Sequence, residues 1–181
     1  MNKKFASAVS GGAVLMLVLS GCGGDDGGEK VNAWAKKVCD KWAPELQKVA
    51  VASADMKRVS GTTSKPDEVQ KTDSAAFQVQ SDAYKAMSAA VSSAGAPPTE
   101  DGQAAQTAAV QGFEAASKAY ADLKTKIDAL DPKDQTKFAD GLSQMSGAIA
   151  EANKGSKEAY AKVTVGDLKK AVESQKGCKV S

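Results

Sequence analysis

The sequence predicts an all-α domain: an up-down-up-down four-helix bundle with a short fifth C-terminal helix and one disulfide. Apolar residues recur in steps of three and four over most of the chain, which is the spacing of one face of an α-helix. Clusters of Gly, Pro and Ser divide this pattern into four long segments and a short one. The turns between the long segments are short, so we expect neighbouring helices to be antiparallel.

The first predicted helix runs from about Glu29 to Ser60. Pro44 falls inside it. Because proline removes a backbone hydrogen bond and clashes with the preceding turn, we expect either a kink near residues 41–44 or two abutting helices. The apolar face of this segment consists of Val31, Trp34, Ala35, Val38, Trp42, Leu46, Val49, Ala52, Met56 and Val59.

The second predicted helix begins near Pro66, a residue type that suits a first helical turn, and ends before Gly95. Two polar residues, Asp73 and Gln80, interrupt its apolar face and make it the least apolar of the four. The face consists of Val69, Asp73, Ala76, Phe77, Gln80, Tyr84, Met87 and Val91.

The third predicted helix has Thr99 as its N-cap and ends before Pro132. Its apolar residues alternate strictly in steps of four and three, which makes it the clearest of the first three helices. These residues are Ala109, Phe113, Ala116, Tyr120, Leu123, Ile127 and Leu130.

In the fourth predicted helix, Pro132 can occupy the first turn, and we expect a break at Asn153–Gly155 because glycine weakens a helix. Its apolar face again follows strict four-three steps. The face consists of Phe138, Leu142, Met145, Ile149, Ala152, Ser156, Ala159 and Val163.

A short last helix follows. Thr164 and Asp167 have the spacing of a capping box, with Asp in the usual place of Glu. Leu168 and Val172 would anchor this helix to the bundle, and Gly177 would end it.

The first 21 residues have the parts of an export signal: Lys3 and Lys4, an apolar run over residues 13–19, and small residues before Cys22. Residues 19–22, Leu-Ser-Gly-Cys, resemble the lipobox of bacterial lipoproteins. The resemblance implies cleavage before Cys22 and a diacylglyceryl thioether on its sulfur. The alternative is an ordinary secretory signal followed by an incidental cysteine.

We therefore divide the chain into a lipoprotein signal peptide (1–21), a lipidated cysteine with a flexible tether (22–29), and a helical-bundle domain (30–181). Glycine makes the tether flexible, and its acidic residues keep it solvated. Two or more acyl chains hold a protein stably at a membrane. The expected location is the outer, extracytoplasmic face of the cell membrane, with lipid on Cys22 as the anchor.

The composition excludes several function classes. Two of the 24 basic residues belong to the signal, so 22 basic residues remain against 22 acidic residues. The net charge of the remaining chain is therefore balanced and gives no reason to expect a nucleic-acid partner. The sequence has no histidine, which excludes Ser-His-Asp and Cys-His catalysis and His-ligated zinc. We expect no metal and no cofactor.

Cys39 and Cys178 are the two cysteines that remain once Cys22 carries lipid. In the oxidising space outside the cytoplasm they predict one disulfide, and two free thiols are the alternative. The bond would close nearly the whole domain. In the chain-entropy model a loop of that length contributes about 4–5 kcal/mol.

The candidate ligand or partner contacts are aromatic: Trp34 and Trp42, which flank Cys39, and Tyr120. Both tryptophans lie on or beside the apolar face of the first helix, so core packing around the disulfide is the favoured interpretation. Tyr84, Tyr120 and Tyr160 each follow a similar Ser-to-Ala stretch, one on each of three helices, which could indicate a repeat or a shared pocket. Because the chain is rich in Ala, chance is the favoured interpretation.

Acid–base catalysis would need carboxylates that converge in a cleft. The carboxylates of the helices alternate with lysines on faces that we expect to be solvated, so we expect no enzymatic activity. The residues in question are Asp73, Asp82, Glu114, Asp122 and Asp128.

The chain as a whole resembles the small exported lipoproteins of actinobacteria. The resemblance rests on the lipobox, the Gly/Asp tether, the Ala- and Lys-rich helical body, a late cysteine, and an early pattern formed by Val31, Trp34, Val38, Cys39 and Trp42. It implies a location at the cell envelope and supplies no activity.

We expect a non-enzymatic binding or scaffold module that acts through a protein partner at the cell envelope. The alternative is a carrier or sensor of a small apolar ligand held between the helices, and an enzyme is a third class. An exposed apolar patch would favour the first, an enclosed cavity the second, and a cleft of convergent carboxylates the third.

Overall fold

A computed structural model describes residues 26–61 and 63–179, and within these residues the chain forms helices and no strand. The long helices are α1 (Asp26–Val59), α2 (Pro66–Ala94), α3 (Gly102–Asp128) and α4 (Gln135–Ala161). A short α5 (Gly166–Ser174) and a 3-10 turn, η1 (Lys176–Cys178), follow them. The predicted helical bundle with a short additional helix is confirmed.

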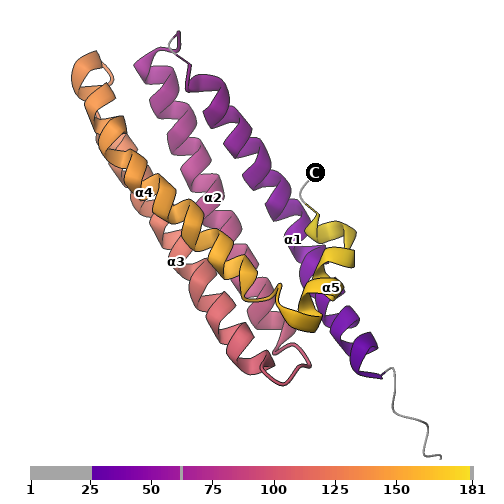
Figure 1. Cartoon of the computed structure of the whole chain (residues 1–181). Helices are drawn as coiled ribbons and strands as arrows, with labels where there is room; N and C mark the ends of the chain where they lie inside the picture. The colour runs from indigo at the N-terminus through magenta and orange to yellow at the C-terminus, as the bar shows by residue number, and fades with distance from the viewer. Residues whose placement is uncertain (1–25, 62, 180–181) are drawn as a thin grey trace, which may run out of the picture.

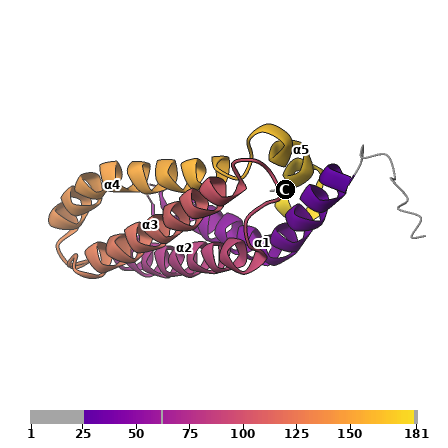
Figure 2. The same cartoon turned by 90° about the horizontal axis from the view of Figure 1, so that it is seen from below.

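The long helices pack in chain order, α1 on α2, α2 on α3 and α3 on α4 (Figure 1). α5 and η1 turn back onto α1 (Figure 2). We call this the disulfide end, and the opposite end, with the α1–α2 and α3–α4 turns, the distal end. No Cα atom of α1 lies within 8 Å of one in α4 over their described residues. Backbone packing therefore leaves the α1–α4 side of the bundle open.

Buried side chains form two cores. The disulfide-end core draws on α1 to α5 and η1, and its large members include Trp34, Val38, Trp42, Met87, Phe113, Leu168 and Val172. The buried members of the distal core come from α2, α3 and α4 alone: Phe77, Tyr120, Leu123, Ile127, Phe138, Met145 and Ala152. α1 adds the partly buried Met56 to the distal core. The first helix thus closes one end of the bundle much more completely than the other.

α1 is one continuous helix through Pro44, so the alternative of two abutting helices is wrong. Asp40 and Pro44 are both exposed, and water can therefore satisfy the Asp40 carbonyl that proline leaves without a helical partner. The helix begins at Asp26, three residues before the predicted start and inside the predicted tether. Burial of Val31 and Trp34 in the core one to two turns later holds this early start in place.

The start of α3 differs from the prediction. Its N-cap residue is Asp101, and Thr99 lies in the preceding turn, where its carbonyl accepts a hydrogen bond from the Gly102 N–H at 3.0 Å. Gly102 packs directly on the Pro97 carbonyl, a contact that any Cβ at position 102 would block. Because of this tight turn, α3 begins later in the chain than predicted, and Thr99 is not its N-cap.

The start of α4 also differs. Asp134 is its N-cap, with its carboxylate accepting from the Lys137 N–H at 3.1 Å. Pro132 lies in the turn before it and not in the first helical turn. The predicted break at Asn153–Gly155 is wrong as well, because α4 continues to Ala161 with Ala152 and Ser156 buried on either side of those residues.

The capping box predicted for the last helix does not form. The Thr164 hydroxyl donates to the Tyr160 carbonyl at 3.1 Å, and Val165 is the N-cap of α5, without a side-chain hydrogen bond. The helix ends at Ser174, three residues before Gly177, which belongs to η1. Leu168 and Val172 are buried, as predicted.

Candidate functional site

An open groove of about 870 Å³ runs along the outer surface between α1 and α2. Only these two helices line it, so it lies outside both cores. Its apolar centre includes Val51, which is 56% exposed. The lining residues are Pro44, Gln47, Lys48, Val51, Ala52, Asp55, Arg58, Glu68, Lys71, Thr72, Ala75, Ala76 and Val79.

Charged side chains surround this apolar centre. At the distal end of the groove Arg58 bridges the two helices, with a guanidinium nitrogen 3.3 Å from Glu68 and another 3.9 Å from Asp55. Lys48 pairs with Glu45 at 2.9 Å near the other end. An apolar strip with a charged rim is the usual composition of a protein-binding surface.

The candidate contacts Trp34 and Trp42 are core residues. Trp34 is 5% exposed and Trp42 is fully buried. The Trp34 indole N–H donates to the Gly95 carbonyl at 2.8 Å, and that of Trp42 to the Met87 carbonyl at 3.1 Å. Both rings therefore fix α1 against the C-terminal half of α2 rather than face a partner.

Six aromatic rings form a continuous column inside the bundle. Neighbouring ring centroids are 5.2–6.3 Å apart, an ordinary range for packed aromatic pairs. In order, the rings are Tyr160, Trp42, Phe113, Tyr84, Tyr120 and Phe77. The tyrosines on α2, α3 and α4 that the sequence could not connect thus share one column, in which Tyr84 stacks on Tyr120.

Tyr120, the third candidate contact, is 1% exposed. Its hydroxyl donates to Asn153 Oδ1 at 2.9 Å and so joins α3 to α4. Burial raises the pKa of the Tyr120 phenol and that of the Tyr84 phenol. Both phenols stay protonated at neutral pH and act as packed core groups.

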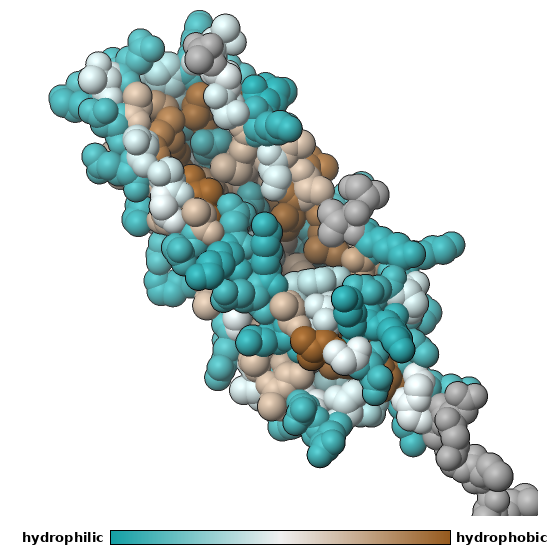
Figure 3. Space-filling view, in the orientation of Figure 1, coloured by the Kyte–Doolittle hydropathy of each residue, from teal (hydrophilic) through white to brown (hydrophobic). Residues whose placement is uncertain are grey.

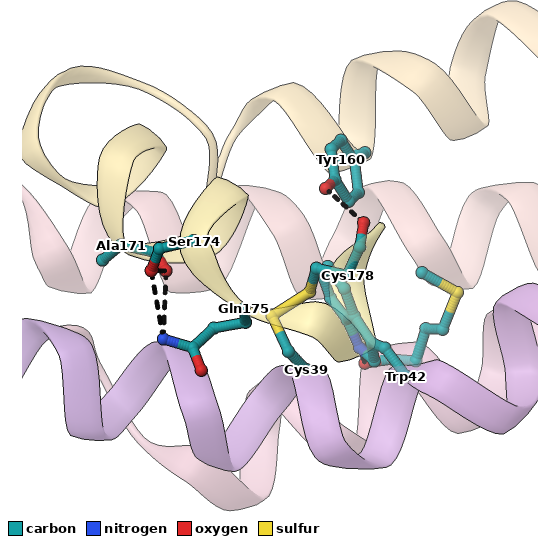
Figure 4. Close-up of a disulfide and its surroundings, with 8 residues drawn as sticks. Cys39, Trp42, Tyr160, Ala171, Ser174, Gln175 and Cys178 are labelled. Atoms are coloured by element: carbon teal, nitrogen blue, oxygen red, sulfur yellow. Dashed lines mark hydrogen bonds between the residues drawn. A yellow bond between two sulfur atoms is a disulfide. The ribbon is translucent and has the colours of Figure 1, made fainter. Parts of the chain in front are cut away.

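The predicted disulfide is present: Cys39 of α1 is bonded to Cys178 of η1, 139 residues later, with Cα atoms 5.0 Å apart (Figure 4). Trp42 and Tyr160 lie beside the bond, and the Tyr160 hydroxyl is 3.5 Å from the Cys178 carbonyl oxygen (Figure 4). Gly177 packs directly on the Cys39 carbonyl. The site is a structural clamp that holds the C-terminal segment on α1.

The sequence placed Asp73 on the apolar face of the second helix and also among the solvated carboxylates, and the second expectation is wrong. It is partly buried, and burial raises the pKa of its carboxyl to about 6. Its Oδ1 is the one buried side-chain oxygen or nitrogen without a hydrogen-bond partner in the described part of the chain. Two turns later the buried Gln80 donates only to the Met56 thioether, at 3.6 Å. The interior of α2 thus carries two poorly satisfied polar groups.

The other carboxylates named from the sequence lie on the surface of the bundle, as expected. Asp122 pairs with Lys118 at 2.7 Å and Asp128 with Lys124 at 2.5 Å, while Asp82 accepts from Gln78 at 3.1 Å. Glu114 is also exposed. Over residues 26–61 and 63–179 no three His, Cys, Asp or Glu side chains gather in a way that could hold a metal ion.

Cys22 and the predicted signal peptide lie outside the described residues. Among the helices of the described part, none combines the length and the hydropathy that a membrane span requires.

Sequence reasoning missed both the groove and the environment of Asp73. Val51 and Val79 lie off the apolar faces, and no pattern within one helix shows that they come together across two. For Asp73 a signal existed, because it shares a helical face with Val69, Phe77 and Gln80. Comparison with known proteins adds no candidate: no family model, no curated protein and no solved structure matches the chain.

Proposed function

We propose that the chain is a membrane-anchored extracytoplasmic lipoprotein whose helical bundle binds a protein partner at the cell envelope and catalyses no reaction. The observation that carries the proposal is the open groove of about 870 Å³ between α1 and α2. Its apolar centre lies on the outer surface, where a partner can reach it. The lipobox at residues 19–22 supports the anchor.

The anchor would set the position of the groove. Lipid on Cys22 is four residues from the start of α1, which limits the connection to about 14 Å. Along α1, Pro44 lies about 27 Å and Arg58 about 48 Å from Asp26, at a rise of 1.5 Å per residue. With the disulfide end next to the membrane, the groove would stand well clear of the lipid headgroups. That position favours a protein over a lipid surface as the partner.

The shape of the groove suits an amphipathic helix. The stretch from Pro44 to Arg58 is about 21 Å long, equal to about four helical turns. A helix with one apolar face could cover Val51 and Val79 while its charged flanks pair with Lys48, Asp55 and Glu68 on the rim. This is the helix-in-groove mode of recognition.

The anchor is tested by the mass of the protein extracted from membranes of the producing cells. We expect a chain that begins at Cys22 and carries a diacylglyceryl group, and we expect Cys22→Ala to lack the lipid. If Cys22→Ala stays in the membrane fraction after signal cleavage, another element holds the protein there.

The groove is tested by photo-crosslinking in intact cells. A photoreactive residue at Val51 should give a discrete protein adduct, whereas the same residue at Val165 should not. Val165 is a matched control because it is 55% exposed, compared with 56% for Val51, and does not line the groove. The same adduct from both positions would contradict a specific docking site.

The crosslinked partner, once purified, allows a quantitative test. Val51→Lys introduces a charge into the apolar strip and should weaken binding about tenfold or more, the effect of losing one central contact. Val165→Lys should leave the Kd unchanged. An unchanged Kd for Val51→Lys would show that the partner binds elsewhere.

The alternative function, a carrier or sensor of a small apolar ligand held between the helices, is favoured by one observation. Several apolar side chains of the distal core are only partly buried, on the side where the backbones of α1 and α4 stay apart. At the disulfide end, by contrast, Trp34, Trp42 and Phe113 fill the interior.

A further inference from the structure

Asp73 is the least satisfied polar side chain of the distal half. Its Oδ1 is buried without a hydrogen-bond partner, and the described residues supply it with no ion pair. An unpaired buried carboxylate costs stability. A donor from outside the chain would therefore stabilise this carboxylate.

On the face of α2 that Asp73 shares, the residues within two turns include two apolar side chains and one amide. On α2 it lies between Val69 and Phe77, one turn from each, and two turns from Gln80. The Gln80 amide points toward α1, where its hydrogen bond goes to the weak thioether acceptor of Met56 at 3.6 Å. Met56 and Val69 are partly buried against the distal core.

The distal half of the bundle is open on the α1–α4 side. The backbones of α1 and α4 stay apart there, and Figure 3 shows apolar side chains on both sides of a hollow between them in the distal half. We call this space the distal furrow. Met56 of α1, Val69 of α2, and Leu142 and Ile149 of α4 are partly buried against the distal core, and we take them as its border. A small molecule could enter it without separating any packed pair of helices.

Arg58 and Lys124 form ion pairs with carboxylates other than Asp73. Arg58 pairs with Asp55 and Glu68 at the outer groove, and Lys124 pairs with Asp128 on α3. Lys71 lines the outer groove. No ion pair of the described residues includes Asp73, so a cationic ligand could supply its partner.

We propose that the distal furrow binds a small organic amine, with its ammonium group on the Asp73 carboxylate and its apolar body against Met56, Leu142 and Ile149. An ammonium donor would satisfy the unpartnered Oδ1, and the apolar body would cover side chains that α1 leaves half exposed. The inference rests on the alternative function, a ligand between the helices, and is independent of the outer groove.

The test uses the purified full chain in detergent, with the methionine methyl groups labelled with ¹³C. Benzylammonium is the probe, and benzyl alcohol and benzoate are its neutral and anionic counterparts. We expect a saturable shift of the Met56 methyl signal with benzylammonium and none of the Met87 signal in the disulfide-end core. Benzyl alcohol should bind about 10- to 100-fold more weakly, the effect of losing a hydrogen bond to a charged group.

Asp73→Asn should weaken benzylammonium binding by a similar factor. Asp82→Asn is the matched control, since it makes the same change on the exposed face of the same helix. A Met56 shift that persists unchanged in Asp73→Asn, or the absence of a saturable shift, would overturn the proposal. If benzyl alcohol binds as tightly as benzylammonium and Asp73→Asn has no effect, the furrow holds apolar ligands and only the amine inference fails.

Discussion

At the disulfide end, side chains from α1 to α5 and η1 surround Trp42, whereas at the distal end the buried core is built by α2, α3 and α4. The first end has a covalent bond between α1 and η1 and two indole hydrogen bonds from α1 to α2. The second has half-buried apolar side chains, an unpartnered carboxylate and a groove on its outer surface.

In the proposed function, this difference between the two ends would assign stability to the disulfide end and binding to the distal half. Stabilising contacts concentrate at the disulfide end, near the predicted anchor, and leave the distal half less completely packed. Regions with few buried apolar contacts open most easily, and binding surfaces are commonly found there. The rigid end would therefore hold the distal half in place while that half adapts to a ligand or partner.

The largest expected effect comes from the disulfide. Replacing both Cys39 and Cys178 by Ser should lower the free energy of unfolding by about 4–5 kcal/mol, because the bond closes a 139-residue separation. Hydrogen exchange should show α5 losing protection before the distal part of α4. The denatured, unreduced wild type should show no free thiol from these residues, and two free thiols would contradict the bond.

Core truncations sharpen the comparison between the ends. Trp42→Ala should lower the free energy of unfolding by about 3–5 kcal/mol, because it empties a fully buried site and removes the hydrogen bond to the Met87 carbonyl. Met56→Ala at the distal end should cost about 1–2 kcal/mol because Met56 is only partly buried. Denaturant unfolding measures both, and equal losses would show that the two ends are equally well packed.

Asp73 predicts a pH dependence specific to the distal end. Its folded pKa, about 6, lies above the unfolded value of 3.8, so the folded state binds the proton more tightly. The contribution of Asp73 to stability is then fully present below about pH 4 and is lost as the pH rises through about 6. Asp73→Asn should remove this decline and raise stability at neutral pH, on the order of 1 kcal/mol for one poorly solvated polar group. Thermal melts from acidic to neutral pH measure the stability of the wild type and of Asp73→Asn. If the melting temperatures of both proteins change in parallel with pH, Asp73 is not the group responsible.

The smallest expected effect compares two glycines. Gly147 in α4 has open space where a Cβ would lie, with nothing within 4 Å, so Gly147→Ala should stabilise the protein by about 0.5–1 kcal/mol through helix propensity. Gly112 in α3 lies against Ala159 of α4, where an added Cβ would be 2.7 Å from the Ala159 Cβ. Gly112→Ala should therefore destabilise the closely packed α3–α4 contact. Equal effects in thermal melts would contradict this difference.

The sequence predicts well what depends on one helix at a time. The third apolar face is buried at each predicted position from Ala109 to Ile127 and partly buried at the last, Leu130, and both cysteines form the predicted bond. Helix ends were less predictable, because local contacts replace the expected caps. Gly102 packs on the Pro97 carbonyl, and the Thr164 hydroxyl donates a hydrogen bond to the Tyr160 carbonyl.

The candidate sites depend on contacts between helices, which spacing within one helix does not encode. Periodicity shows that Trp42 and Met56 share a face, but not that α4 covers the first and leaves the second open. In the same way, the groove around Val51 arises because α1 and α2 pack along their other faces. For Asp73, the sequence placed the residue on the apolar face of the second helix, but only its neighbours show that its Oδ1 lacks a hydrogen-bond partner.

The position of the disulfide near both ends of the domain has a consequence for biosynthesis. Export proceeds from the N-terminus, so in the route that we propose Cys39 would leave the cytoplasm 139 residues before Cys178. Oxidation of the correct pair would have to wait until the intervening helices have been translocated. During that interval the Cys39 thiol would be open to pairing with another molecule, and rapid docking of α1 on α2 through Trp34 and Trp42 would shield it.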